Sequence, residues 1–542
     1  MEIAQHDEND PFRDPAGMTE GSRRSLDVAA VLTVDRNATL TLGTDSLIVL
    51  DEGLKYRRAT ENCCGLLPQL SKTTRAIPFY NILWAELNDD LEITMHYAAQ
   101  HGGKGCSVEY INYAIADKSL HSHAKKWVEA VMDRAYPPDT KRKKRIKVLI
   151  NPFGGQGSAQ KLWTRQCEPI FAAAKCEVDV DNTAYKGHAI EIAERIDVDT
   201  VDVIACASGD GLPHEVFNGL AKQKHPRRAL RKVAVTQLPC GSGNAMSANL
   251  NGTNSPSLAA LAIVKGVRTP IDLVGITQGK NTFYSFLSQS VGIVAESDLG
   301  TESLRWMGPF RFTWGFLVRM LGHTIYPAEV SVAVDEADKQ TIQEIYRQAV
   351  QEAKSVALKH SAASDVMDVS EESGGELPPL KYGTVADPLP PNFQTEDMPT
   401  LGNFYVGNMC LMASDAPFFS AALPSDGRMD MISIDGLVSR LVALRMLVSV
   451  EHGGLIDFPE VAYRKVLAYR ISPRVHQVPA RHRLRTKIGR WLSGAGKRTE
   501  GYISIDGESV PFQPFQAEVL PCLGTVLSKR RSLYEFEWPL PS

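Results

Sequence analysis

The stretch Ile150-Asn151-Pro152-Phe153-Gly154-Gly155-Gln156-Gly157 directly follows an apolar run at residues 146–150. Two similar stretches come later: Ser208-Gly209-Asp210-Gly211-Leu212-Pro213-His214-Glu215, and Leu238-Pro239-Cys240-Gly241-Ser242-Gly243-Asn244. Each follows a short β-branched run and precedes a helical pattern. The three turns should therefore meet at the C-terminal ends of parallel strands, where open α/β sheets bind ligands. Glycine lets backbone N–H groups approach a phosphate, so this edge predicts a nucleotide site.

Strand and helix patterns alternate through residues 141–280. Strands are expected at 146–150, 177–181, 201–206 and 232–237, and helices at about 159–174, 187–196, 212–223 and 255–265. This alternation predicts a doubly wound α/β domain. Longer strand-like runs predict a second, β-rich domain over residues 281–525, followed by a tail at 526–542.

The remaining segments have distinct compositions. Residues 1–25 are polar and predicted to be disordered, and 26–140 predict a β-rich accessory module, with a PH-like fold as one candidate. Residues 360–398 are rich in Ser, Glu, Gly and Pro, which predicts a disordered insertion. A basic insertion at 476–499 has apolar residues at helical spacing, which fits either a membrane-surface helix or an ordinary insertion.

Composition bounds the class of protein. A chain of 542 residues is too long for one core, and its net charge of −4 argues against a nucleic-acid binder held by overall basicity. No run of about 18 uncharged apolar residues occurs, and the acidic N-terminus does not resemble a signal peptide. The nine cysteines do not form the pattern of a disulfide framework, so we expect reduced thiols and a cytoplasmic protein.

Asp210 is the candidate catalytic residue. The first turn lacks a Walker A Gly-Lys-Ser/Thr, and the third lacks the last glycine of G-x-G-x-x-G, so phosphates would be held mainly by backbone N–H groups. A carboxylate between two glycines at the head of a helix is well placed to take a proton from a substrate hydroxyl beside a triphosphate. The alternative is that Asp210 only caps its own helix.

The three turns, with Glu215, Asn218 and Leu220 after the second, resemble the catalytic domain of the diacylglycerol-kinase-like superfamily. Within this superfamily, the sequence resembles the sphingosine (long-chain base) kinases of the fungal type. Ser208 and Leu212 distinguish it from diacylglycerol kinases, which usually have Gly-Gly-Asp-Gly-Thr at these positions. The resemblance covers about residues 146–525. It implies an ATP-binding α/β domain, a β-sandwich lipid-binding domain, and Mg²⁺-dependent transfer of phosphate from ATP to a primary hydroxyl.

The resemblance also implies site residues. Those expected to line the nucleotide are Asn151, Gly154, Gly155, Gly157, Thr183, Ser208, Gly209, Gly211, Gly241, Ser242 and Gly243. Glu302, Arg305 and Arg311 would act at the phosphates, and Asp506-Gly507-Glu508 would reach back to the nucleotide, with Asp506 on Mg²⁺. The alternative for Asp506-Gly507 is a tight hairpin turn. Phe153, Gln156 and Ser158 stand where many relatives have basic residues, which weakens the expected charge of the first turn.

The stretch 288–298 resembles the substrate-recognition segment of the same family. Asp298 would hold the amine and hydroxyl of a sphingoid head group, with Ser288 and Val294 nearby. The alternative interpretation of Asp298 is a surface aspartate that precedes a helix. Phe312 and Phe316 belong to an aromatic stripe that would line the alkyl slot, or would be plain core.

The sequence also suggests a partner surface. Cys63-Cys64 resembles acylation sites of related fungal enzymes, and palmitate there would give peripheral membrane association; the alternative is an inert buried pair. Two rival functions remain, a kinase for diacylglycerol or ceramide, and a catalytically inactive lipid sensor at membranes. The sequence does not determine the oligomeric state or which long-chain base is preferred.

Overall fold

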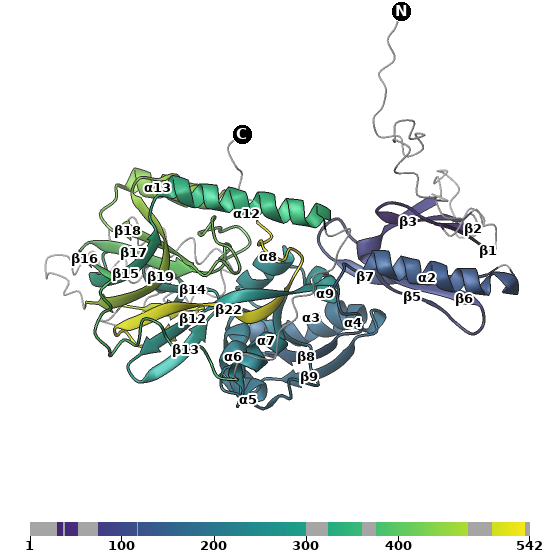
Figure 1. Cartoon of the computed structure of the whole chain (residues 1–542), viewed down its shortest axis with the longest axis horizontal. Coiled ribbons are helices and arrows are strands. Elements are labelled where there is room, and N and C mark those ends of the chain that lie inside the picture. The colour runs from purple at the N-terminus through teal and green to yellow at the C-terminus, as the bar shows by residue number, and fades with distance from the viewer. Residues whose placement is uncertain are drawn as a thin grey trace, which may run out of the picture. The chain divides into compact units, whose positions relative to one another are not determined.

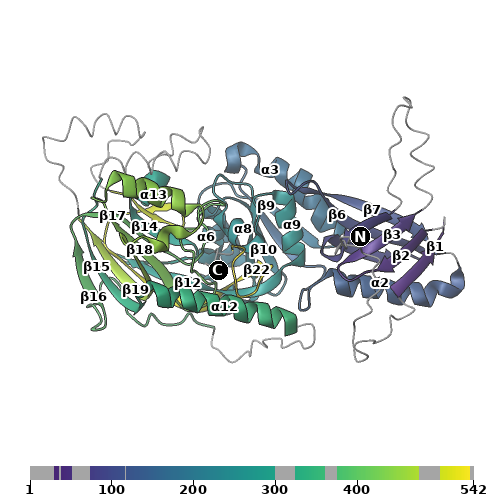
Figure 2. The same ribbon diagram turned by 90° about the horizontal axis from the view of Figure 1, so that it is seen from above.

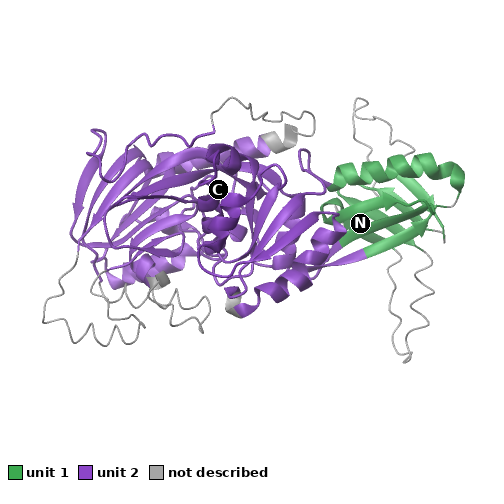
Figure 3. Ribbon diagram, turned by 90° about the horizontal axis from the view of Figure 1, so that it is seen from below, with its two compact units in different colours: residues 1–97, 110–135 green, residues 98–109, 136–542 purple. Residues whose placement is uncertain are grey.

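The structure is a computed structural model, and it describes residues 30–35, 38–51, 74–115, 117–299, 324–359, 375–474 and 501–536. The chain forms two compact units (Figure 3). One comprises residues 1–97 and 110–135, and the other comprises 98–109 and 136–542. The expectations for residues 1–25, Cys63-Cys64 and the basic insertion 476–499 lie outside the described residues.

The smaller unit is built from strands and one helix. Its strands are β1 (Val31–Val34), β2 (Ala38–Leu42), β3 (Ser46–Asp51), β4 (Thr74–Pro78), β5 (Ile82–Leu87), most of β6 (Glu92–Gln100) and the second half of β7 (Cys106–Ala114). Strands β1–β4 form one sheet and β5–β7 another. Helix α2 (His121–Ala135) buries Trp127 and Val131 on its apolar face. The predicted β-rich character is confirmed.

The larger unit contains the predicted parallel sheet (Figure 1). The strand order is β9 (Glu177–Asn182), β8 (Arg145–Ile150), β10 (Val203–Ser208) and β11 (Ala234–Pro239). Its helices are α3 (Ala159–Leu162), α4 (Glu168–Ala173), α5 (His188–Arg195), α6 (Gly211–Leu220), α7 (Pro226–Lys232), α8 (Ala245–Asn251) and α9 (Pro256–Lys265). The predicted α/β class is confirmed. The predicted helix 159–174 is divided by a π-helical turn at Trp163–Cys167.

The parallel sheet continues into the β-rich part. Strand β22 (Phe515–Ser528) pairs parallel with β11, and antiparallel with β12 (Val267–Gln278) and β19 (Val461–Pro473). The remaining elements are β13 (Asn281–Ser285), β14 (Ser288–Gly292), α10 (Ile293–Leu299), β15 (Ala328–Glu336), α12 (Lys339–Lys359), β16 (Gln394–Met398), β17 (Leu401–Gly407), β18 (Met429–Asp435), α13 (Arg440–Val450), β20 (Ile503–Ile505) and β21 (Glu508–Val510). Together the strands form one 15-stranded sheet. The boundary predicted at 280/281 therefore does not separate two sheets, because it falls between β12 and β13 of one continuous sheet. The predicted tail from 526 begins inside β22.

Residues 375–398 correct the prediction of a disordered insertion over 360–398. This segment ends in β16, which pairs with β15. Before that, Glu518 accepts hydrogen bonds from the backbone N–H groups of Lys381 and Tyr382, and Gln516 donates to the carbonyl of Tyr382. Side chains of β22 thus form hydrogen bonds with the backbone of a segment whose polar composition predicted disorder.

None of the helices in the described ranges has the length and apolar character to cross a bilayer.

Asp272 joins β12, β22 and a loop in the interior. It lies where the β12–β22 register shifts, and its carboxylate accepts hydrogen bonds from the N–H groups of Cys522 (2.7 Å) and Gly427 (2.6 Å). Its own N–H donates to the carbonyl of Pro424. Burial raises the pKa of Asp272 from 3.8 to about 7, although the two donors oppose this shift.

The pKa of Asp272 is higher in the folded state than in the unfolded chain. Between about pH 4 and pH 7 the folded protein therefore keeps a proton on Asp272 that the unfolded chain has released. The free energy of unfolding contributed by this group should fall as pH rises through that window. We predict that the free energy of unfolding of the wild type, relative to that of Asp272→Asn, falls by about 2 kcal/mol between pH 5 and pH 7, as measured by urea unfolding. The exposed Asp415→Asn serves as the control, and a difference independent of pH would contradict the prediction.

Candidate active site

The four neighbouring parallel strands end at one edge, and the predicted nucleotide residues lie at those ends. Asn151 follows β8, and its Oδ1 accepts a hydrogen bond from the N–H of Phe153. Thr183 follows β9, is buried, and donates both its N–H and its hydroxyl to the carbonyl of Ile150. The ends of β8 and β9 are thereby tied together under the first turn.

The second and third turns touch through their glycines. A Cβ atom at Gly241 would lie 2.3 Å from Cα of Gly209, and one at Gly209 would lie 2.8 Å from the carbonyl oxygen of Gly243. Any side chain at these positions would push the turns apart. Asn244 closes the third turn, because its side chain exchanges two hydrogen bonds with the backbone of Gly241.

Asp210 is the N-cap residue of α6, but its side chain makes no capping hydrogen bond to that helix, which argues against the alternative role considered for it. Its half-buried carboxylate crosses to the next strand end. Oδ2 accepts from the N–H of Ala245 at 2.9 Å, and Oδ1 accepts from the N–H of Met246 at 3.0 Å and Gln237 Nε2 at 3.2 Å. Burial raises the pKa of Asp210, although these donors oppose it, so the carboxylate is a stronger base than an exposed one.

Helix α6 is anchored to its neighbours by two side chains that follow Asp210. Glu215 accepts hydrogen bonds from the N–H groups of Gly187 and Ala189 and so caps the start of α5. Asn218 donates to the carbonyl of Tyr284 and accepts from its N–H, which fixes α6 to β13. The position of Asp210 thus depends on contacts with two other elements.

A third anchor joins α6 to the β20–β21 hairpin. His214 Nδ1 lies 2.8 Å from Asp506 Oδ2, and Asp506 is almost fully buried at 1% exposure. Burial lowers the pKa of His214, but the hydrogen bond to Asp506 and the nearby carboxylates outweigh this and raise it. The Asp506 carboxylate also accepts hydrogen bonds from the hydroxyl of Ser285 and from the N–H groups of Phe286, Leu287 and Ser288.

The geometry of Asp506 does not fit the predicted Mg²⁺ ligand. Its two oxygens already accept five hydrogen bonds, whereas a carboxylate offers about four lone-pair sites. Asp506 and Gly507 have φ values of 51° and 82°, so they also form the tight turn considered as the alternative. Within the described ranges, no group of three His, Cys, Asp or Glu side chains converges on a metal position.

Glu508 is the acidic residue of this hairpin that faces the glycine turns. A Cβ atom at Gly211 would lie 2.9 Å from its Oε1, and its Oε2 forms an ion pair with Lys186 from the loop after β9. Glu508 and Lys186 therefore bring opposite charges to the residue next to Asp210.

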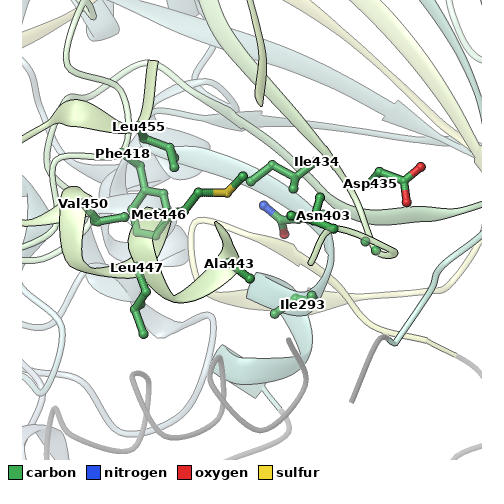
Figure 4. A pocket seen from close by; sticks show the side chains of 13 residues that line it. Ile293, Asn403, Phe418, Ile434, Asp435, Ala443, Met446, Leu447, Val450 and Leu455 are labelled. Atoms are coloured by element: carbon green, nitrogen blue, oxygen red, sulfur yellow. The ribbon is translucent and has the colours of Figure 1, made fainter. Parts of the chain in front are cut away.

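The predicted substrate segment forms β14 and α10. Ser288 opens β14 and its N–H donates to Asp506, and the N–H of Val294 donates to Asn403. Ile293 and Asn403 line an apolar pocket with residues from β18, α13 and neighbouring loops (Figure 4). The remaining lining residues are Gly402, Phe418, Ile434, Asp435, Gly436, Val438, Ala443, Met446, Leu447, Val450 and Leu455. Its accessible volume of about 30 Å³ holds no more than a water molecule or two.

Several predicted residues receive no structural account. Glu302, Arg305, Arg311, Phe312 and Phe316 lie outside the described residues, and Asp298 is placed in α10 without its side chain. Sequence reasoning assigned no role to several residues that the structure places around the turns, namely Lys186, His214, Glu215, Asn218, Gln237 and Asn244. A signal existed for two of these, because His214 and Asn218 follow Asp210 at helical intervals of four.

Comparison with known proteins identifies the family of the chain. Residues 145–276 match the diacylglycerol kinase catalytic domain, and residues 30–137 match a domain of unknown function (DUF7493). The sphingoid long chain base kinase 5 of Saccharomyces cerevisiae is 35% identical over 462 residues, which are 76% of this chain and 63% of that protein. The alignment thus spans a little under two thirds of that relative.

A second relative aligns over nearly its whole length. The sphingoid long chain base kinase 4 of Schizosaccharomyces pombe is 32% identical over 467 residues, covering 86% of this chain and 90% of that protein. A crystal structure of a diacylglycerol kinase from Bacillus anthracis has a TM-score of 0.45 at 16% identity, covering 72% of this chain and 98% of that one. From the two yeast relatives and the matched catalytic domain, the chain belongs to the family of sphingoid long-chain base kinases.

Proposed function

We propose that this chain transfers the terminal phosphate of ATP to the primary hydroxyl of a sphingoid long-chain base. The observation that carries this proposal is the Asp210 carboxylate, which is held between two touching glycine turns by donors from Gln237, Ala245 and Met246. A sensor that only binds a lipid has no need of a base beside a phosphate cradle.

In the proposed reaction, the substrate hydroxyl donates its proton to Asp210. The hydroxyl oxygen forms a bond to the γ-phosphorus, and the bond from that phosphorus to the bridging oxygen breaks, which releases ADP. Oδ2 of Asp210 has one donor, Ala245, among the described residues, so a lone pair remains for the substrate. Lys186 adds a cation beside the turns, where the first turn has none.

We assign the sphingoid tail to the apolar pocket under α13. Ile293 of the pocket directly follows β14, and the first residue of that strand, Ser288, donates to Asp506, so a head group near Asp506 would lie one short strand from a tail in the pocket. The closed pocket must widen to accept an alkyl chain, and Met446 is a flexible residue suited to such a change. The β-rich part would then serve as the lipid-binding domain, with Asp298 as the proposed partner of the substrate amine.

Mg²⁺ and membrane attachment complete the proposal. Mg²⁺ neutralises phosphate charge when bound, usually through phosphate oxygens, water and one or two carboxylates. Glu508 is the residue we assign to this role in place of Asp506. We further propose that the enzyme is cytoplasmic and peripherally attached to membranes, with Cys63, Cys64 and the basic insertion 476–499 as attachment sites.

Transfer of labelled phosphate from ATP tests the substrate class. We expect transfer to dihydrosphingosine but not to ceramide or diacylglycerol, and a loss of about 10²–10⁴ in kcat for Asp210→Asn. Asp415→Asn should retain wild-type activity. Transfer to a neutral lipid would move the assignment to a ceramide or diacylglycerol kinase, and no transfer with ATP still bound would favour the inactive sensor.

The raised pKa of Asp210 predicts a pH dependence. The base acts only when it is deprotonated, so kcat/KM should fall on the acidic side at a higher pH than an ordinary carboxylate would give. Gln237→Met removes one donor to the carboxylate and should move this acidic limb further upward in pH. An acidic limb near pH 4 that is unchanged in Gln237→Met would refute the assignment.

Asp506 and Glu508 should respond differently to loss of charge. Asp506→Asn leaves buried donors without an acceptor, at a cost of about 1–3 kcal/mol each in the free energy of unfolding, measured in urea without ATP or Mg²⁺. Glu508→Gln should leave stability within about 0.5 kcal/mol and raise the Mg²⁺ concentration for half-maximal activity. The reverse pattern would restore the metal role to Asp506.

A further inference from the structure

Helix α13 carries apolar side chains on two sides. Its inner side buries Ala443, Met446 and Val450, which line the apolar pocket. On its outer side and in the preceding turn, four large apolar residues face solvent, with exposed fractions of 59% for Leu437, 77% for Leu441, 46% for Leu444 and 62% for Val448. Helices of soluble proteins usually place polar residues on such a face, so this exposed apolar surface indicates a binding surface.

We call these four exposed residues the α13 stripe. Leu441, Leu444 and Val448 follow one another at intervals of three and four residues, which places them on one face of α13, and Leu437 lies in the turn before the helix. Arg440 and Arg445 are exposed and lie on opposite flanks of the stripe, given 100° per residue. Helix α13 contains no acidic residue, and neither arginine forms an ion pair with a carboxylate in the described part of the chain.

We propose that the α13 stripe docks this chain on a bilayer surface that carries anionic lipid. Four apolar side chains would enter the region between head groups and acyl chains, while Arg440 and Arg445 would contact lipid phosphates. A stable protein partner would cover about 20–30 residues on each side, far more than this stripe offers. Shallow insertion beside positive charge requires only a small apolar surface, as found here.

The position of the stripe suits a lipid-modifying enzyme, and this step rests on the proposed function. Figures 1 and 2 both show α13 at the outside of the larger unit. The stripe and the pocket lie on opposite sides of the same short helix, so docking would place the pocket one helix away from the bilayer surface.

Vesicle co-sedimentation of the full chain tests the docking surface directly. The vesicles contain phosphatidylcholine alone or phosphatidylcholine with phosphatidylserine. We expect Leu441→Asn with Leu444→Asn to weaken binding at least tenfold, because two apolar side chains lose their burial. Val178→Asn with Val180→Asn, on the exposed face of β9, is the matched control and should bind as the wild type.

Arg440→Gln and Arg445→Gln should each weaken binding about fivefold on vesicles with phosphatidylserine, and much less on phosphatidylcholine alone. Unchanged binding of both the apolar and the arginine variants would overturn the proposal. A change in oligomeric mass by light scattering, with vesicle binding unchanged, would also overturn it, since the stripe would then be a protein interface.

A kinase assay separates this proposal from the proposed function. With base dispersed in detergent, the Leu441→Asn, Leu444→Asn variant should keep activity within about twofold of wild type, whereas activity on vesicle-embedded base should fall with binding. Equal loss in detergent and on vesicles would contradict the docking role. If no base is phosphorylated in either form, the proposed function fails, and vesicle binding alone still decides the docking surface.

Discussion

The buried carboxylate of Asp506 holds together the elements around the site. It accepts hydrogen bonds from His214 on α6, from the hydroxyl of Ser285, and from three successive backbone N–H groups at the start of β14. A buried charge is tolerated only when its lone pairs are satisfied, and here the protein satisfies all of them. Because α6 also carries Asp210, the same carboxylate links the nucleotide edge to the segment that leads into the apolar pocket.

A second constraint is the close approach of the glycine turns after β10 and β11. Gly209 and Gly241 leave no room for side chains, and Asp210 uses the resulting contact to bind the N-terminus of α8. The carboxylate is thus positioned by backbone donors on a neighbouring strand. Its burial and its capping partners act on its pKa in opposite directions, which leaves a base that is stronger than normal yet fixed in place.

The β-rich part is continuous with the α/β part, because β22 pairs with strands of both. Asp272 fixes the irregular point of the β12–β22 ladder, and Glu518 and Gln516 of β22 bind the segment before β16. A single sheet therefore connects the strands behind the turns to the strands beside the pocket. The apolar pocket and the exposed α13 stripe share one helix, so a change in the position of α13 would affect both.

The local pattern of this sequence was sufficient to predict the parallel strands, the three turns at one edge, and the family, because each depends on residues close together in the chain. Tertiary structure decided the rest. The carboxylate of Asp506 accepts hydrogen bonds from residues that precede it by more than 200 positions. The carboxylate of Asp210 caps a helix that begins 35 residues later. Residues 375–398 are ordered through side chains of β22. Such contacts satisfy buried polar groups across the chain, and spacing along a sequence carries no record of which distant groups meet.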